Sequence, residues 1–138
     1  MTIRDYRTAD YPGVEKLWKK TGIYTLERGD TAGIIERCND LGGRFLVMED
    51  PGSDNIIGTS WMTFDGRRIH MHHFAIAPSF QGSGLGRELA IRSLDFAREK
   101  ECPMKLEVHQ KNVAAVNLYK SLGFVPFEDY DVYMILDP

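Results

Sequence analysis

The sequence lacks the features that mark several classes of protein. It has two cysteines in 138 residues, Cys38 and Cys102, and their separation fits no metal-binding spacing, which favours a reduced, cytoplasmic compartment over a disulfide scaffold. No apolar run approaches the length of a bilayer span, and the N-terminal segment has no apolar core of signal-peptide length. The net charge of -3 comes from interspersed acidic and basic residues, so there is no basic stripe for nucleic acid. We therefore expect a cytoplasmic protein that binds neither membranes nor nucleic acid.

The sequence contains enough apolar residues for one hydrophobic core. Of its 138 residues, 43% are hydrophobic, and this length suits one core and is short for two, so residues 1–138 are expected to form one domain. Hydrophobic periodicity and turn residues predict a mixed α/β order of elements. The expected helices cover about residues 10–20, 31–39, 85–99 and 113–122, and the expected strands cover residues 2–6, 45–48, 56–64, 70–77, 104–109, 125–127 and 130–136. The segment Gly22–Gly29 between the first two helices is a candidate substrate-facing loop.

The chain from His70 to Gly86 is predicted to run from a buried strand through a glycine-rich turn into a helix. Pro78 ends the hydrogen-bond ladder because it has no donor. Glycines occupy the alternate positions 82, 84 and 86, where the backbone N–H groups can approach a ligand closely. The helix that follows presents its unpaired N–H groups and its partial positive charge to the same turn. The turn is therefore a candidate phosphate site.

Two common phosphate loops do not fit this turn. A dinucleotide-binding fingerprint requires a glycine where this sequence has Arg87, and a nucleotide triphosphate P-loop requires Gly-Lys-Ser/Thr, which does not follow here. The segment Gln81–Gly86 instead has the pattern Gln-x-x-Gly-x-Gly, which resembles the acyl-CoA pyrophosphate loop of the GNAT family of N-acetyltransferases. The segment Asn112–Phe124 has the pattern Asn-x-x-Ala-x-x-x-Tyr-x-x-x-Gly-Phe, which is similar to the second signature of that family at every position.

The resemblance implies a fold, a reaction and a set of site residues. The implied fold is a single-domain GNAT fold of the mixed α/β (α+β) class, with a central sheet of about six to seven strands flanked by about four helices. The implied reaction transfers an acetyl group from acetyl-CoA to a primary amine by direct attack in a ternary complex. The implied cofactor contacts are the backbone of Phe74, Ala75 and Ile76, the loop residues Gln81, Gly82, Ser83, Gly84, Leu85, Gly86 and Arg87, and the side chains of Asn112 and Tyr119.

Acetyl transfer to an amine requires a base and is accelerated by an acid. An alkyl ammonium group has a pKa of about 10 and must lose a proton before it can attack, and the departing thiolate has a conjugate acid with a pKa of about 8.5. Tyr119 matches the tyrosine of the family's second signature. The resemblance therefore assigns Tyr119 the role of general acid.

The sequence offers two kinds of candidate base. Glu107 lies in a Leu-Glu-Val segment similar to that of ribosomal-protein N-terminal acetyltransferases, whose glutamate acts as base, although a glutamate here can equally be solvated or bind backbone amides. His72 shares one face of its strand with His70, while His73 takes the other face, and an imidazole with a pKa of about 6.5 can accept a proton. No third ligand is spaced to complete a tetrahedral metal site with His70 and His72, so no metal is expected.

Three questions stay open at this point. The acceptor is either a protein N-terminal amine, which the Leu-Glu-Val segment favours, or a small-molecule amine. The alternative function is that of a CoA-binding regulatory module without turnover, although such a module has no need of Tyr119. The C-terminal strands, with Tyr130, Val132, Tyr133 and Ile135, either pair between two subunits of a homodimer or are covered within one chain.

Overall fold

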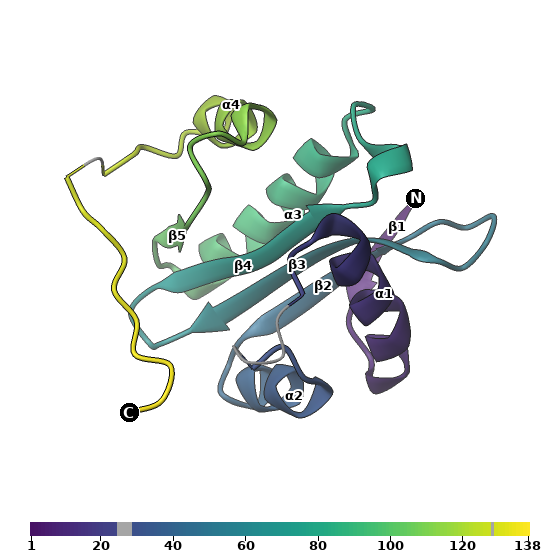
Figure 1. Cartoon of the computed structure of the whole chain (residues 1–138), viewed down its shortest axis with the longest axis horizontal. Helices are drawn as coiled ribbons and strands as arrows, with labels where there is room; N and C mark the ends of the chain where they lie inside the picture. Colours follow the sequence, from purple (N-terminus) through teal and green to yellow (C-terminus); the bar gives the residue numbers. More distant parts are fainter. Residues whose placement is uncertain (25–28, 128) are drawn as a thin grey trace. The chain divides into compact units, whose positions relative to one another are not determined.

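The computed structural model describes residues 1–24, 29–127 and 129–138, and these fall into two compact units, Met1–Glu107 and Val108–Pro138. The first unit contains the β-sheet and the helices α1, α2 and α3 (Figure 1). The second contains helix α4 and the C-terminal segment, which comprises residues 125–127 and 129–138 of the described chain. The candidate loop Gly22–Gly29 lies partly outside the described residues. In the ranges above, no helix is long and apolar enough to cross a membrane.

The described part of the first unit is built on a five-stranded sheet. Its strands are β1 (Thr2–Asp5), β2 (Arg44–Glu49), β3 (Ile56–Phe64), β4 (Ile69–Ile76) and β5 (Met104–Leu106). The spatial order follows the sequence order, with antiparallel pairing from β1 to β4 and parallel pairing between β4 and β5. A tight turn makes the β3–β4 hairpin, because the Asp65 carboxylate accepts hydrogen bonds from the backbone N–H groups of Arg67 and Arg68. The predicted strands before the glycine turn are confirmed.

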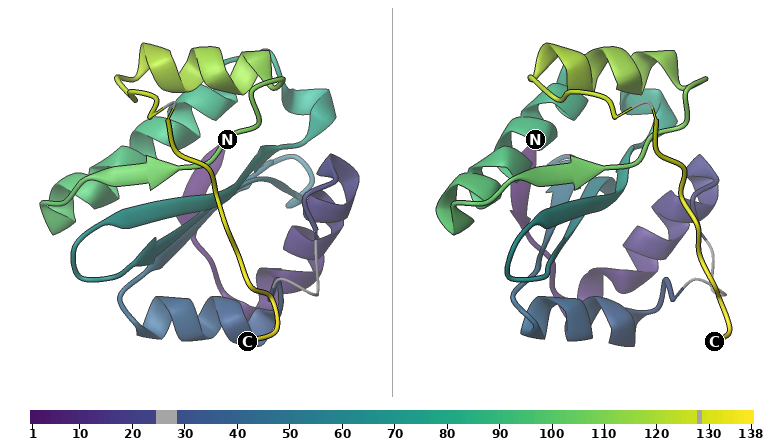
Figure 2. Two further views of the ribbon diagram at one scale, coloured as in Figure 1. Left: turned by 60° about the vertical axis from the view of Figure 1, so that its left-hand side comes forward. Right: turned by 90° about the vertical axis from the view of Figure 1, so that its left-hand side faces the viewer.

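Helices cover both faces of this sheet. They are α1 (Tyr11–Thr21), α2 (Ala32–Asp40) and α3 (Leu85–Lys100), with short 3-10 turns at Thr8–Asp10 and Pro78–Phe80. Figure 2 shows α1 and α2 on one face of the sheet and α3 on the other. The helix ends follow the local sequence, since Thr31 Oγ1 accepts a hydrogen bond from Ile34 N at the start of α2, and Gly22 ends α1 with φ of +77°.

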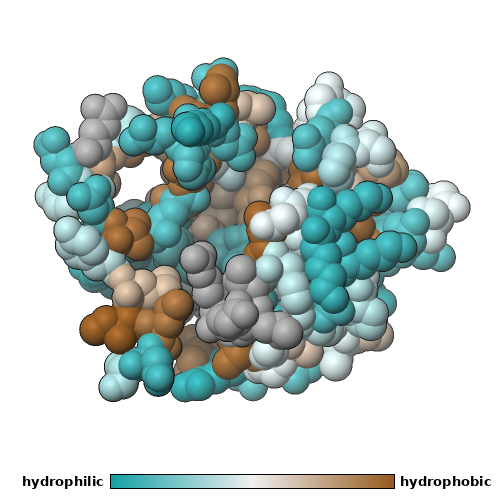
Figure 3. Space-filling view, viewed as in Figure 1, coloured by the Kyte–Doolittle hydropathy of each residue, from teal (hydrophilic) through white to brown (hydrophobic). Residues whose placement is uncertain are grey.

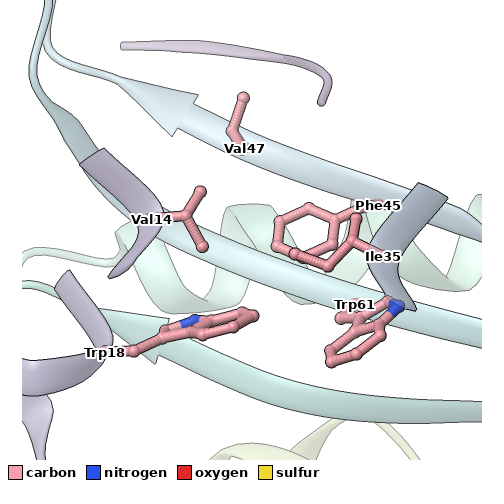
Figure 4. Close-up of a cluster of buried hydrophobic side chains, with 6 residues drawn as sticks. All are labelled: Val14, Trp18, Ile35, Phe45, Val47 and Trp61. Carbon is pink, nitrogen blue, oxygen red and sulfur yellow. The ribbon is translucent and has the colours of Figure 1, made fainter. Parts of the chain in front are cut away.

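Aromatic side chains form the core between the sheet and helices α1 and α2. This cluster comprises Val14 and Trp18 of α1, Ile35 of α2, Phe45 and Val47 of β2, and Trp61 of β3 (Figure 4). The Trp18 ring lies 5.9 Å from the rings of both Phe45 and Trp61, and its Nε1 donates a hydrogen bond of 3.0 Å to Thr59 Oγ1. Burial of each large apolar side chain contributes about 1.5–3 kcal/mol to stability. The cluster therefore holds α1 firmly on β3.

Helix α3 is joined to the opposite face by a buried pair of serines. The Oγ atoms of Ser60 in β3 and Ser93 in α3 lie 2.7 Å apart, and both residues are fully buried. Neighbouring residues of a strand point to opposite faces, so Ser60 faces α3 while Trp61 faces α1 and α2. Since α3 starts just after β4 and leads to β5, this packing places the glycine loop at the end of β4.

An ion cluster joins β1 to its neighbours. The Arg4 guanidinium donates two hydrogen bonds of 2.8 Å to the carboxylate of Asp10, and two of 2.7 and 3.2 Å to that of Glu49. The Arg4 side chain is only 17% exposed. Its hydrogen bonds lower the pKa of the Asp10 carboxyl group. Arg4 therefore ties the first strand both to β2 and to the start of α1.

The second unit contains helix α4 (Val113–Ser121). Asn112 Oδ1 accepts a hydrogen bond of 3.3 Å from Ala115 N and caps the helix. The Phe124 ring packs edge-on against the Tyr119 ring, with the centroids 5.6 Å apart. The predicted helix over residues 113–122 is confirmed.

The predicted C-terminal strands are wrong. Residues 125–127 and 130–136 lie in no strand, so the described chain has five strands where six or seven were expected. A strand needs a neighbouring strand to pair with its backbone N–H and C=O groups. In the described part of this unit the regular element is helix α4, whose backbone groups bond within the helix, so it offers no such partner. Brown hydrophobic atoms lie on the surface along this segment at the lower left of Figure 3. The exposed apolar residues are Val125, Phe127, Tyr130, Val132, Tyr133, Met134, Ile135 and Leu136, at 60% to 93% exposure.

Candidate active site

The glycine loop between β4 and α3 leaves its backbone uncovered. Gly82 and Gly84 have φ of +81° and +85°, which favour glycine. Apart from the adjoining residues of the chain, no described residue has an atom within 4 Å of the position that a Cβ would take. Gly84 is the N-cap residue of α3, and the N–H groups of a first helical turn have no acceptor within the helix. Ser83 Oγ donates to Phe80 O at 2.9 Å, which holds the loop in this form. The loop has the geometry of an anion site.

Strands β4 and β5 separate close to this loop. They pair only over residues 69–71 of β4 and 104–106 of β5. On its other side β4 pairs with β3 as far as Ile76. The gap in the ladder that an added strand requires is therefore present along residues 72–76 of the described chain.

The open edge of β4 presents backbone groups. Ile76 O accepts a hydrogen bond of 2.9 Å from Gln81 Nε2, and Ala77 N donates one of 2.7 Å to Ile57 O in β3. The N–H and C=O of one strand residue point to the same side, and this side alternates along the strand. The Ile76 N–H therefore points away from β3, where it can bond a carbonyl oxygen.

A β-bulge in β4 changes the direction of one histidine. The pairing register with β3 shifts between Thr59 and Trp61, and His73 has φ of +44°, which is unusual for a residue with a side chain. The His73 ring lies 4.5 Å from the Trp18 ring and 5.3 Å from the Trp61 ring, and the His72 ring lies 6.0 Å from that of Trp61. His73 thus shares a face with His72, and the prediction of opposite faces is wrong because the bulge interrupts the alternation.

His70 and His72 form a pair on this face. Their ring centroids are 3.8 Å apart, and His72 Nε2 lies 2.9 Å from Thr63 Oγ1. Burial, followed by the nearby positive charge that protonated His70 would carry, lowers the pKa of His72 to about 3. Burial also lowers the pKa of His70. His72 is therefore neutral near pH 7 and a poor proton acceptor.

Glu107 follows β5 directly and reaches toward this pair. Its Oε1 lies 3.7 Å from His70 Nε2, which is longer than a hydrogen bond, and its side chain is 55% exposed. The structure thus brings Glu107, His70 and His72 into one region. Within the described residues, no group of three or more His, Cys, Asp or Glu side chains is arranged to hold a metal ion.

Asp30 joins this face although the sequence alone did not indicate it. Its Oδ2 lies 2.9 Å from His73 Nε2, and its side chain is 2% exposed. Its backbone O accepts a hydrogen bond of 2.8 Å from Tyr11 OH. In the sequence Asp30 stands just before the helix cap Thr31 and looks like part of a helix start. The residues around Asp30 in the sequence therefore did not indicate that its carboxylate is buried against the imidazole of His73.

Tyr119 and Asn112 belong to the second unit. Asn112 caps α4, so its side chain has a structural contact in this unit. Tyr119 is buried, and burial raises the pKa of its hydroxyl to about 12. The phenol is therefore protonated at neutral pH, which is the state that a general acid requires.

The open edge of β4 and the glycine loop at the start of α3 together define a class of protein, the transferases that bind an acyl-CoA thioester. The chain belongs to the acetyltransferase (GNAT) family, which matches residues 3–124. It is an acyltransferase that uses acetyl-CoA as co-substrate, and the family resemblance drawn from the two sequence signatures is confirmed.

Two relatives show how far the similarity extends. The L-amino acid N-acyltransferase MnaT of Escherichia coli (strain K12) is 30% identical over 137 residues, which cover 91% of this chain and 80% of MnaT. The mycothiol acetyltransferase of Thermobifida fusca is 36% identical over 99 residues, which cover 64% of this chain and 31% of that protein. The chain therefore corresponds to most of MnaT but to less than a third of the second relative.

Solved structures share the fold. The Salmonella typhimurium protein YncA, determined with its cofactor acetyl-CoA, is 27% identical with a TM-score of 0.75, and the match covers 90% of this chain and 79% of YncA. The ribosomal-protein-S18-alanine N-acetyltransferase of Escherichia coli is 21% identical with a TM-score of 0.74, and the match covers 88% of this chain and 76% of that enzyme. The second likeness is one of fold alone.

Proposed function

We propose that this acetyltransferase transfers the acetyl group from acetyl-CoA to a primary amine by direct attack in a ternary complex. The observation that carries the proposal is the open edge of β4 beside the glycine loop. The pantetheine arm pairs with β4 as an added strand, and the pyrophosphate lies at the start of α3. The cofactor-binding residues are Phe74, Ala75, Ile76, Gln81, Gly82, Ser83, Gly84, Leu85, Gly86, Arg87, Asn112 and Tyr119.

The oxyanion and the leaving thiolate each have a partner in this proposal. The Ile76 N–H donates a hydrogen bond to the oxygen that becomes negative as the amine attacks. Tyr119 gives its proton to the departing sulfur, and its pKa of about 12 keeps that proton available at neutral pH.

Glu107 and His72 are the bases that the sequence suggests, and the geometry favours Glu107 of these two. His72 has a pKa of about 3 and therefore accepts a proton poorly. The Glu107 side chain is more than half exposed and lies 3.7 Å from His70, so a proton that it takes can pass to solvent. Glu107 is exposed, and the partner of His72 is the neutral hydroxyl of Thr63 rather than a carboxylate.

The acceptor that we favour is the α-amino group of an L-amino acid. MnaT, whose name describes an L-amino acid N-acyltransferase, aligns with 91% of this chain. A protein N-terminal amine is the second candidate, because the Leu-Glu-Val segment at residues 106–108 resembles that of the ribosomal-protein acetyltransferases.

Thiol release from acetyl-CoA tests both the reaction and the acceptor. The purified protein is given acetyl-CoA with a panel of L-amino acids, peptides with a free N-terminus and simple alkyl amines, and the same amino acids with an acetylated amine serve as controls. We expect thiol release with free amino acids and none with the controls. A regulatory module would instead be stabilised by acetyl-CoA, by about 2.7 kcal/mol at a hundredfold excess over Kd, and would release no thiol with any amine.

A cytoplasmic location and a homodimer complete the proposal. Cys38 and Cys102 are free thiols, which is consistent with a reduced compartment. The exposed apolar residues of the C-terminal segment support association with a second copy. Alkylation of both thiols in freshly lysed cells tests the first point, and the test of the second is described below.

A further inference from the structure

His73 and Asp30 form a pair that the reaction described above does not use. The Asp30 carboxylate is 2% exposed and lies 2.9 Å from His73 Nε2, whereas the His73 side chain is 19% exposed. One nitrogen of the ring is thus held at a buried carboxylate while part of the ring remains accessible. Burying a carboxylate costs free energy unless the carboxylate is hydrogen-bonded. The contact with His73 offsets this cost for Asp30.

The backbone at His73 is held in place by its neighbours. Thr59 Oγ1 accepts a hydrogen bond of 3.0 Å from Trp18 Nε1 and donates one of 2.8 Å to His73 O. The rings of Trp18 and Trp61 both contact the imidazole. These contacts stabilise the φ of +44° at His73, a conformation that clusters at functional sites. The bulge therefore presents this imidazole directly before the β4 edge that receives the cofactor.

The contact with Asp30 decides which nitrogen of His73 can accept a proton. Nε2 carries the hydrogen and donates it to the carboxylate, so the lone pair lies on Nδ1. The carboxylate fixes the orientation of the ring and stabilises the imidazolium ion that forms when Nδ1 is protonated. This arrangement is the one that His72 lacks, since its contact is with the Thr63 hydroxyl.

We propose that His73, oriented by Asp30, is the general base that takes the proton from the acceptor amine. This inference rests on the acetyl transfer proposed above. An ammonium acceptor gives one proton to His73 Nδ1, and the free amine attacks the thioester carbonyl, so that a C–N bond forms and the C–S bond breaks. As the intermediate collapses, Tyr119 gives its proton to the sulfur, and the second proton of the nitrogen passes through water to the Tyr119 oxygen. His73 returns its proton to water, so the net products are the amide, the free thiol of CoA and one proton. Asp30 is a positioning residue.

Two variants at His73 test the proposal while keeping the unusual backbone. Asparagine and glycine both tolerate positive φ, so His73→Asn and His73→Gly preserve the bulge. We expect each variant to lose about 10²- to 10⁴-fold in kcat and to bind acetyl-CoA with a Kd within about twofold of wild type. Added imidazole restores part of the kcat of His73→Gly, because the missing ring leaves room for it. An imidazole that has only a structural role gives no such rescue.

The pH profile of kcat/KM provides a second test of His73 as the general base. Among residues 1–24, 29–127 and 129–138, the titratable groups that face His73 include Asp30, from the segment before α2, and His72, from its own strand. Helix α1 and strand β3 face it with Trp18 and Trp61. We expect the acidic limb of the profile to disappear in His73→Asn. In Asp30→Asn we expect that limb to shift to lower pH, because the neutral amide no longer stabilises the imidazolium ion, with a smaller loss of kcat than in His73→Asn.

Matched variants separate the possible outcomes. His109→Asn removes an exposed imidazole of the second unit and is expected to leave kcat unchanged. If His73→Asn keeps wild-type kcat, or if His72→Gln alone abolishes turnover, the assignment of the base is wrong while the acetyl transfer stands. If wild type releases no thiol with any amine, the proposed function itself fails, and the two failures are thereby distinguished.

Discussion

At the scale of single residues, Tyr119 is the most direct test of the proposed chemistry. Its hydroxyl is buried and has a pKa of about 12, so Tyr119→Phe removes one proton donor without removing the ring. We expect kcat to fall about 10²- to 10⁴-fold, whereas calorimetry gives nearly the same Kd for acetyl-CoA. Tyr133→Phe, at a tyrosine of the same unit that is 93% exposed, is the control. Equal losses of kcat and CoA affinity would remove Tyr119 from the acid role.

His72 gives a prediction about pH and stability. Its pKa is about 3 in the folded protein, lowered first by burial and then by His70, His73 and Lys105, with Asp30 acting in the opposite direction, and about 6.5 in the unfolded chain. The unfolded state therefore binds more protons between these values, so stability falls as pH drops below about 6.5.

The variant His72→Gln isolates this contribution. It keeps a polar partner for Thr63, and we expect urea unfolding to lose up to about 1.4 kcal/mol less per pH unit between pH 6 and 5 than in wild type. His109→Gln, at an exposed histidine, should follow the wild-type pH dependence. A parallel curve for His72→Gln would show that this imidazole titrates normally.

At the scale of elements, the connection between β4 and α3 depends on the backbone of Gly84. With φ of +85° and open space around the Cβ position, alanine here meets no clash but adopts a strained conformation that costs about 1–2 kcal/mol. We expect Gly84→Ala to lower the melting temperature and to weaken acetyl-CoA binding. Gly33→Ala, in α2 with ordinary φ and equally open space, should be neutral or stabilising, and an unchanged Kd in Gly84→Ala would exclude this loop from the cofactor site.

The Arg4 cluster gives a prediction for β1. Arg4→Met leaves the mostly buried carboxylates of Asp10 and Glu49 without their guanidinium, and hydrogen bonds to charged groups contribute about 1.5–3 kcal/mol. We expect a loss of that size in the free energy of unfolding at pH 7. The matched variant is Arg98→Met, whose ion pair with Asp95 is exposed and should contribute about 0–1 kcal/mol. Similar effects of the two variants would mean that the Arg4 cluster is not structural.

At the scale of the whole molecule, we predict that the protein dimerises through its C-terminal segment. It combines exposed apolar side chains with backbone that lies in no strand, and an exposed apolar segment of this kind favours association. We expect sedimentation equilibrium to show a dimer at micromolar concentration. The double variant Val132→Lys with Ile135→Lys is expected to be monomeric, and Asn117→Lys, on the exposed surface of α4, is expected to dimerise as wild type does. A monomeric wild type would contradict the prediction.

Local rules of the chain account for much of this molecule. The β2–β3 and β3–β4 hairpins, the glycine turn, the start of α2 at Thr31 and the cap of α4 at Asn112 all depend on residues close to one another in the chain. The glycines of the loop were recognisable for the same reason, since their positive φ is a property of the single residue. The second signature likewise placed Tyr119 on a helix.

Only the tertiary structure decided the direction of His73, the burial of Asp30 and the state of the C-terminal segment. His73 and Asp30 are 43 positions apart, and their contact depends on the bulge of β4 at His73 and on the hydrogen bond from Tyr11 of α1 to the Asp30 backbone. Strand formation also depends on residues far apart in the sequence. Residues 130–136 have the alternation of apolar and polar residues that is typical of a strand, but they form one only if another strand pairs with their backbone N–H and C=O groups. The sequence by itself determined what each segment favours over a few residues, and tertiary packing decided which distant segments meet.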